Sequence, residues 1–287
     1  MDSSKAKPTI LSLQYLCYPD ATGGAWKLTH EINKRMVKRG YRVVLITCKP
    51  SQDFSDHEII DGVEFYRIAF AISKDPIRLW RAVQKKIKQH LIEEEPWIAH
   101  VHHPLVGAFA LTMKQYRKIP KTYHFHSSWY DEEKINLTEK GKGGINLYLR
   151  LKIIRWLEWV CYLCSKSIIF LSEYSRQRFI DYFPFKKPRM RIIPGGADTI
   201  KFCPSENSNE LIETRNRLGI QEGYKFLLTI RRLEPRMGLD NLITAIAKIV
   251  NRNPEHKFKL VIGGKGSLND KLKSQTTLLG LDDYIHF

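Results

Sequence analysis

Segments with strand character alternate with segments of helix character along the whole chain, and this alternation constrains the fold more than any other feature. The run YRVVLITC at 41–48 is almost continuously apolar, which is typical of a strand covered on both faces. Before it, apolar side chains recur every four residues at Leu28, Ile32 and Met36, which predicts a helix. Such alternation predicts an α/β fold with a mostly parallel, doubly wound sheet flanked by helices.

The remaining elements follow the same alternation. In the first part of the chain, strands are expected at 9–16, 63–68, 97–103, 121–126, 167–172 and 189–194. Helices are expected there at 24–39, 77–94, 105–117, 145–165 and 173–182. The alternation then restarts, with strands at 224–230, 257–262 and 284–287 and helices at 239–251 and 268–279.

Prolines and glycines concentrate at 183–210, between the two series of elements. Such a composition is typical of a connection between domains. We therefore expect a first Rossmann-like domain over 1–190, a hinge over 191–210 and a second Rossmann-like domain over 211–287. The second series supplies few strands, so we expect this domain to be incomplete, with an uncovered sheet edge.

The chain has 47 Lys and Arg residues against 30 Asp and Glu residues, a formal net charge of +17. This excess predicts an anionic partner, which can be phosphate groups, nucleic acid or an acidic membrane surface. Hydrophobic residues make up 43% of the chain, which excludes a wholly disordered protein. No apolar run approaches the roughly 18–20 residues of a membrane-spanning helix, and the N-terminus lacks a signal peptide's apolar stretch. We therefore expect a cytoplasmic protein.

The five cysteines are an odd number spread over a long chain, which disfavours a disulfide scaffold. Cys161 and Cys164 form a CxxC motif inside an apolar helical stretch, and no second pair follows. We interpret them as half-buried cysteines of a helix rather than as a zinc or redox site.

Gly23 and Gly24 follow the first expected strand and open the first expected helix. Glycines at such a turn let a ligand approach the backbone, and the N-terminus of a helix attracts phosphate or carboxylate groups. The sequence is neither GxGxxG nor a Walker loop, which disfavours NAD and P-loop nucleotides. Packing in a tight turn explains the two glycines equally well.

Five histidines stand at the ends of two consecutive expected strands, namely His100, His102, His103, His124 and His126. Ligands of parallel sheets bind at the carboxyl ends of the strands, so we expect at least one of these histidines to line a cleft. Imidazoles are also good metal ligands. No carboxylate or cysteine stands at metal spacing beside them, so we assign no metal. A purely structural role for these polar residues is the alternative.

Arg231 and Arg232 end the first strand expected in the second domain, and Gly238 precedes the helix after it. Arginines beside a helix start suit a diphosphate, since charge-assisted hydrogen bonds add to backbone N–H donors. A second strand then runs into a glycine-rich turn that contains Gly264, Lys265 and Gly266. These features predict phosphate binding at matching strand ends of both domains, which we expect to face each other across the hinge.

Several stretches, taken in order, together resemble glycosyltransferase family 4, whose architecture is called type B. They are GGA at 23–25 with KRGYRVVLIT, YHFH at 123–126, SKSIIFLSEYS after Glu158, IPGGADTIKF at 193–202, RRLEPRMG at 231–238 and LVIGGKG at 260–266. The resemblance covers nearly the whole chain.

The resemblance implies two Rossmann-like domains and a retaining transfer of a sugar from a nucleotide-diphosphate sugar to a hydroxyl of a glycan or lipid-linked acceptor. It implies no cofactor and no metal, and a role such as cell-envelope glycan synthesis. It maps the active-site histidine to His126 and the diphosphate-binding arginine to Arg232. Further residues expected at the site are Gly23, Gly24, His103, Gly196, Asp198, Arg231, Gly238, Gly264, Lys265 and Gly266.

The sequence departs from the family pattern at three places. Met237 stands where the family has a lysine, and Arg231 stands where it has a glycine. The family's E-x7-E segment is absent from these 287 residues, so we expect a truncated second domain. Two alternatives stay open, a truncated non-catalytic remnant and a basic nucleic-acid-binding protein that is supported by charge alone.

The stretch 145–166 is a helix with Leu151, Ile154 and Leu157 on one face and Arg150 and Lys152 among its basic residues. Such a helix can lie on an anionic membrane, which would suit a lipid-linked acceptor and peripheral attachment at the inner face of the membrane. Packing of its apolar face on its own domain is the interpretation that we favour.

Overall fold

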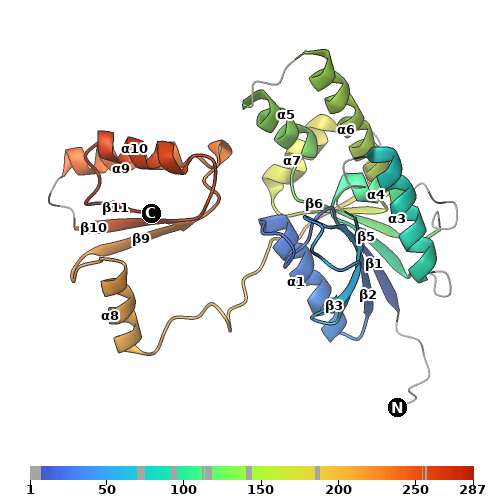
Figure 1. Ribbon diagram of the computed structural model, residues 1–287, viewed down its shortest axis with the longest axis horizontal. Helices are drawn as coiled ribbons and strands as arrows, with labels where there is room; N and C mark the ends of the chain where they lie inside the picture. Colours follow the sequence, from blue (N-terminus) through green and yellow to red (C-terminus); the bar gives the residue numbers. More distant parts are fainter. Residues whose placement is uncertain are drawn as a thin grey trace. The chain divides into compact units, whose positions relative to one another are not determined.

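The computed structural model describes residues 8–69, 75–91, 96–111, 113, 118–139, 144–184, 188–253, 255 and 257–287. The chain divides into two compact units, Met1–Gly196 and Ala197–Phe287 (Figure 1). The division falls inside the stretch 191–210. Each unit is described by itself.

The first unit is built on a sheet of order β3-β4-β2-β1-β5-β6-β7-β8. Neighbouring strands are parallel, except that β3 pairs antiparallel with β4. The strands are β1 (Thr9–Leu13), β2 (Arg42–Cys48), β3 (His57–Ile60), β4 (Val63–Ile68), β5 (Ile98–Val101), β6 (Lys121–Phe125), β7 (Ser167–Phe170) and β8 (Arg189–Ile192). The mostly parallel sheet expected from the sequence is therefore confirmed.

Helices cover both faces of this sheet (Figure 1). They are α1 (Gly24–Lys38), α3 (Pro76–Leu91), α4 (Pro104–Leu111), α5 (Trp129–Glu139), α6 (Ile145–Cys164) and α7 (Glu173–Tyr182). One core cluster joins alternate strand residues such as Leu11 and Val44 to helices α3, α4, α6 and α7. The other cluster joins the intervening residues, such as Ile10 and Val43, to α1. Side chains on the face under α1 therefore have α1 as their helical cover.

Every strand and helix expected in this unit is confirmed, with ends shifted by a few residues. The ends of the helices expected at 77–94 and 105–117 lie in part outside the described residues. Two elements were not expected. Strand β3 is short and exposed, and the turn Asp61–Gly62 with positive φ at both residues joins it to β4. Helix α5 carries Asp131 and Glu132 in its first turn.

Helix α1 differs from its expected packing. Its buried residues are Thr29, His30 and Asn33, whereas the apolar positions from which the helix was predicted are only partly buried. Asn33 donates a hydrogen bond to Ser12 Oγ of β1 at 3.0 Å, and Gln14 donates to Thr29 Oγ1 at 3.2 Å. The helix therefore covers the sheet through these polar contacts as well as through Met36 and Val37, which pack on the core cluster.

Helix α6 turns the predicted apolar face inward, because Leu151, Ile154 and Leu157 are buried. The CxxC cysteines lie at its end as expected, with Cys161 buried and Cys164 exposed, and both are free thiols. The outer face of α6 is also apolar, with exposed side chains at Ile145, Tyr148, Leu149, Ile153, Trp156 and Leu163.

The second unit is a three-stranded parallel sheet of order β11-β10-β9. Its elements are α8 (Ser208–Arg217), β9 (Lys225–Ile230), the 3-10 turn η2 (Pro235–Met237), α9 (Leu239–Arg252), β10 (Phe258–Gly263), α10 (Asn269–Leu278) and β11 (Ile285–His286). Leu239, Ile243 and Ile246 of α9 form its core with β10 and α10. The alternation predicted for this part is confirmed.

Two features of the second unit differ from ordinary packing. Helix α8 begins inside the stretch expected as a hinge, where Asn207 caps it through hydrogen bonds from the backbone N–H groups of Asn209 and Glu210, and none of its residues is buried. Strand β9 pairs only with β10 among the described residues, and Phe226, Leu227, Leu228 and Ile230 are exposed along it. The expected uncovered edge is therefore present.

Among the helices that the structure describes, none combines the length and the apolar character needed to cross a bilayer.

Candidate functional site

The loop between β1 and α1 ends in Gly23 and Gly24, which lie at the N-terminus of α1. A Cβ added to Gly24 would meet no atom of the rest of the protein within 4 Å, so the space on that side of Gly24 is open. A Cβ at Gly23 would lie 2.8 Å from Trp26. Close packing against Trp26 thus explains why position 23 is a glycine. Gly24 leaves room for a ligand at the positive end of the helix.

A buried ion pair holds the same loop. Arg67 of β4 donates two hydrogen bonds to Asp20, one of them 2.8 Å long, and both side chains are buried. Arg67 also donates to Glu58 of β3. Breaking one member of a buried pair leaves an uncompensated charge, so this contact fixes where the chain enters α1.

The strand-end histidines lie on the sheet face under α1. His100 is the register partner of Ser12, whose hydroxyl contacts α1. Side chains two residues apart on a strand share a face, so His102 follows His100 on this side. His124 is stacked on His102 with ring centroids 5.4 Å apart and on His126 with centroids 4.5 Å apart. The structure therefore brings four of the five predicted histidines together.

His126 stands just beyond the end of β6 and contacts His102. Its Nε2 lies 3.2 Å from His102 Nδ1, and its Nδ1 has no hydrogen-bond partner. Burial, followed by the neighbouring imidazoles, holds the pKa of His126 well below its usual range. The ring is therefore neutral at pH 7, and it can donate or accept a hydrogen bond but supplies no positive charge.

His103, also predicted at the site, has a different local role. Its Nδ1 accepts a hydrogen bond from the backbone N–H of Leu105 at 3.2 Å, at the start of α4. Its ring contacts Tyr15 after β1 and Trp129 at the start of α5, with centroids 5.4 and 4.9 Å apart. His103 thus contacts residues that follow the carboxyl ends of β1 and β6, and it lies just after the end of β5.

Glu158 of α6 contacts the backbone at the start of α5. Its Oε1 accepts hydrogen bonds from the backbone N–H groups of Trp129 and Tyr130, at 2.7 and 3.3 Å, while Oε2 has no partner. Burial raises the pKa of Glu158 to about 7, against the lowering effect of the two hydrogen bonds. The sequence motif contained Glu158 but assigned it no role. Neither it nor Trp129 was predicted at the site.

In the second unit, Arg231 and Arg232 follow β9 as predicted. Arg231 donates through its guanidinium to the carbonyl of Met237 at 3.2 Å, which ties it to η2. Arg232 is exposed, and among the described residues its guanidinium makes no ion pair or hydrogen bond. Arg232 is therefore the guanidinium that is available to an anion.

The glycine-rich turn after β10 packs against this segment. A Cβ at Gly264 would lie 1.9 Å from the carbonyl oxygen of Arg231, and one at Gly266 would lie 2.3 Å from that of Leu233. The Leu233 N–H donates to the Lys265 carbonyl at 3.0 Å. The close approach of the two backbones therefore explains why both positions are glycines. The Lys265 side chain between them is exposed.

Gly238 begins α9 with φ 67°, a left-handed conformation that favours glycine. Met237 before it is partly buried and packs against the core of the second unit. At the position of the family's lysine, this chain therefore has an apolar anchor. The predicted diphosphate-binding residues of this unit lie together at the carboxyl ends of β9 and β10.

Gly196 and Asp198 lie on either side of the division between the units, and Gly196 is exposed. The Asp198 carboxylate accepts hydrogen bonds from the backbone N–H groups of Ile200 and Lys201, at 3.2 and 3.1 Å. This arrangement is a local turn of the kind that Asp favours. Ligand binding by these two residues stays a prediction.

Comparison with known proteins decides the family. The profile of Glycosyltransferase Family 4 matches residues 22–201, and the profile of Glycosyl transferases group 1 matches residues 212–287. The chain belongs to glycosyltransferase family 4. The resemblance inferred from the motifs is confirmed.

Curated relatives agree with this family 4 assignment. An uncharacterised glycosyltransferase of Methanocaldococcus jannaschii is 26% identical over 94% of this chain and 66% of its own length. Alpha-monoglucosyldiacylglycerol synthase of Streptococcus pneumoniae is 25% identical over 94% of this chain and 58% of its own length. The chain thus spans about three fifths to two thirds of these relatives.

Solved structures show the same fold for this family 4 chain. Sucrose-phosphate synthase of Thermosynechococcus elongatus has a TM-score of 0.75 at 16% identity. The match includes 98% of this chain and 70% of the synthase. HepE of Anabaena, solved in complex with UDP-glucose, has a TM-score of 0.65 at 19% identity, with 97% of this chain and 68% of HepE covered. The type B fold is confirmed.

Proposed function

We propose that this chain carries the donor- and acceptor-side elements of a retaining glycosyltransferase, which moves a sugar from a nucleotide-diphosphate sugar to an acceptor hydroxyl. Family membership supports this reaction, and the HepE relative is solved with UDP-glucose. The observation that carries the proposal is the exposed Arg232, which lies in the segment that joins the end of β9 to the N-terminus of α9.

The chemical demand of the reaction is to stabilise the diphosphate as it leaves the sugar. Arg232 and the exposed Lys265 supply positive charge, and the start of α9 at Gly238 supplies backbone N–H groups. These protein groups take the role that a divalent cation has in other transferases, so we propose that the donor needs no metal. The open start of α1 at Gly24 is a second place for an anionic group.

His126 is proposed to contact the transferring sugar. Its pKa lies well below the usual range because of burial, so the ring is neutral and acts through hydrogen bonds that orient sugar hydroxyls. Nδ1 is buried and has no hydrogen-bond partner among the described residues, so a sugar hydroxyl that reached it would satisfy it. Glu158 and Trp129 are positioning residues, since they hold the start of α5 beside His103.

A transfer assay tests the proposal. The 287-residue chain is incubated with UDP-, GDP- and ADP-sugars and a set of glycan and lipid acceptors, and the anomeric configuration of the product is measured by NMR. We expect product with the configuration of the donor. Inverted product would contradict the retaining mechanism. Nucleotide binding without any transfer would favour the non-catalytic alternative for this chain.

We further propose a lipid-linked acceptor reached at an anionic membrane surface. The outer face of α6 exposes apolar side chains from Ile145 to Leu163, and the neighbouring α5 exposes Ile135. Lys152 on α6 is exposed, and its Nζ lies 4.7 Å from the centre of the Tyr148 ring. Apolar side chains beside cations are typical of interfacial helices. The relative that is named a monoglucosyldiacylglycerol synthase also favours a lipid acceptor.

Vesicle sedimentation tests the membrane proposal. We expect the chain to sediment with vesicles of phosphatidylglycerol mixed with phosphatidylcholine and much less with pure phosphatidylcholine. Trp156→Ser on the outer face of α6 should release it, whereas the matched control Trp97→Ser, also exposed but outside α6, should not. Equal binding of the two variants would exclude α6 as the membrane contact.

The nucleic-acid alternative loses its support, because it rested on the net charge of +17 alone. The diphosphate of the proposed donor is an anionic partner that suits such a charge.

A further inference from the structure

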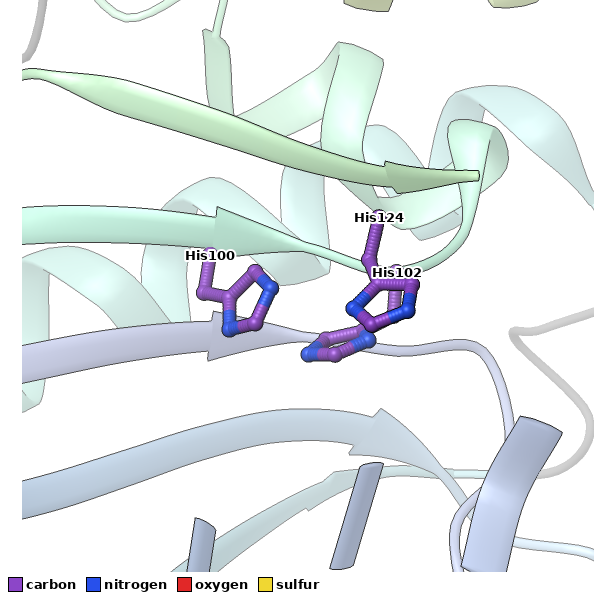
Figure 2. Close-up of side chains that lie close together, drawn as sticks. All are labelled: His100, His102 and His124. Carbon is purple, nitrogen blue, oxygen red and sulfur yellow. The ribbon is translucent and has the colours of Figure 1, made fainter. Parts of the chain in front are cut away.

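Three imidazoles lie together beneath α1, from two neighbouring strands. Figure 2 shows His100 and His102 at the end of β5 and His124 on β6, with their rings turned toward one another. Each offers a nitrogen, and these three nitrogens lie within 4.8 Å of one another. The ring centroids of His100 and His102 are 4.0 Å apart.

The nitrogens of this trio have few partners in the protein. His102 and His124 are buried, with 3% and 4% of their surfaces exposed. Among the residues that the structure describes, His100 Nε2, His102 Nε2 and both nitrogens of His124 have no hydrogen-bond partner. A buried polar atom without a partner costs roughly 1–3 kcal/mol, and here four such atoms stand side by side. A single feature that satisfied several of them would explain their grouping.

We propose that His100, His102 and His124 form a binding site for one divalent transition-metal ion of the zinc type. Three neutral imidazoles are a ligand set that zinc takes in proteins, with the fourth position left to water or another ligand. Imidazole nitrogens also favour Zn²⁺, Co²⁺, Ni²⁺ and Cu²⁺ over Mg²⁺ and Ca²⁺, which prefer oxygen. The sequence expectation of no metal at these histidines is thereby revised.

The spacing is close to what such an ion requires. Zn–N bonds of about 2.0–2.1 Å place tetrahedral ligand nitrogens about 3.3 Å apart. The three nitrogens lie within 4.8 Å of one another, and rotation of the rings about χ2, a soft torsion in histidine, changes the distances among them. His100 and His124 stand on the adjacent paired strands β5 and β6.

The site has a supporting contact of the usual kind. When Nε2 of His102 binds the ion, its Nδ1 carries the proton. This N–H donates a hydrogen bond to His126 Nε2, which lies 3.2 Å away. Metal-bound histidines generally donate their other N–H to such a partner, which fixes the ring. The ion would therefore set the tautomer and orientation of His126. This role is separate from diphosphate binding, which is assigned to the second unit, and the inference stands without the proposed transfer activity.

Metal titration of the untagged chain tests the site. After dialysis against a chelator, Co²⁺ is added and the visible bands of a low-symmetry, nitrogen-ligated ion are recorded, and Zn²⁺ is titrated by calorimetry. We expect one ion per chain and loss of the Co²⁺ bands on addition of Zn²⁺. His100→Asn and His124→Asn should each weaken Zn²⁺ binding by at least about tenfold. His126→Gln should weaken it by about 10–100-fold, the usual cost of losing a supporting partner.

His286→Ala is the matched control, because His286 is an exposed histidine of the second unit. It should bind Zn²⁺ like the wild type. Absence of binding by the wild type, or binding as tight as that of the wild type by either asparagine variant, would overturn the site. X-ray absorption of the zinc-loaded wild type is independent of any variant's folding. It should show three imidazole nitrogens on the ion, and a spectrum of oxygen ligands alone would equally overturn the proposal.

Discussion

Met237 is the residue at which this chain departs most clearly from the pattern of its family. Its side chain packs against the core of the second unit, so it anchors η2 instead of presenting a charge. Arg231 reaches the same turn through the Met237 carbonyl. The cationic groups left for a diphosphate at this end of the sheet are therefore Arg232 and Lys265, both exposed.

A lysine at position 237 should strengthen nucleotide binding. Met237→Lys is expected to raise the affinity for UDP or GDP by about tenfold, because one charge-assisted hydrogen bond is worth roughly that amount. The long side chain can keep its methylenes on the core and its ammonium in water. Calorimetry measures the change, with Met237→Leu as the uncharged control. Equal affinities of the two variants would place position 237 away from the diphosphate.

Single residues were predicted unevenly from the sequence. His126 and Arg232 were predicted at the site because their neighbours form motifs, and their roles stay a prediction. The clustering of the histidines followed from the parallel order of β5 and β6. The roles of Glu158 and Trp129 were missed. They depend on a contact between α6 and the start of α5, and no local pattern reports a contact 29 residues apart in sequence.

At the scale of elements, strongly periodic segments were predicted and weakly periodic ones were not. The spacing of apolar residues predicts buried strands such as β2 and amphipathic helices such as α9. Strand β3 is exposed, α5 has little apolar periodicity and α8 has no buried residue. Their sequences therefore lack the apolar spacing from which a helix or strand is predicted. The Asp61–Gly62 turn and the Asn207 cap were the signals available for β3 and α8.

The attachment of α5 to α6 should depend on pH through Glu158. Burial raises its pKa to about 7 from the usual value of about 4.5, so the folded chain keeps a proton that the unfolded chain releases. The free energy of unfolding therefore falls as pH rises from about 4.5 through 7, by up to about 3 kcal/mol for a shift of this size. Glu158→Gln cannot ionise and should escape this loss.

Urea unfolding of the wild type and of Glu158→Gln at pH 5 and pH 8 measures this difference. All six tryptophans precede residue 197, so their fluorescence reports the first unit alone. We expect the variant to gain stability relative to the wild type between pH 5 and pH 8. A difference that does not change with pH would mean that Glu158 ionises normally.

At the scale of the whole molecule, the two units differ in how fully their sheets are covered. The first unit has helices on both faces, whereas β9 of the second unit has an unpaired edge and exposed apolar side chains among the described residues. An exposed, apolar strand edge can pair with another chain. The alternation of elements predicted this edge before the structure placed it, because so short a series of strands cannot cover both sides of β9.

The 287-residue chain should therefore self-associate through β9. Light scattering during size-exclusion chromatography is expected to show a mass that rises with protein concentration. Leu228→Lys should reduce that rise, since charge on an edge strand opposes pairing. Leu211→Lys on exposed α8 adds the same charge elsewhere and serves as the control. A monomeric wild type, or an equal effect of both lysines, would contradict this expectation.

Arg232 and the start of α9 are proposed to bind the diphosphate of a nucleotide. Calorimetric titration of the chain with UDP, GDP and ADP tests this binding, alongside Arg232→Ala and the control Arg252→Ala at the opposite end of α9. We predict that the wild type and Arg252→Ala bind at least one of these nucleotides and that Arg232→Ala loses about tenfold or more in affinity. Equal affinity of the two variants, or no binding of any nucleotide by the wild type, would contradict the claim.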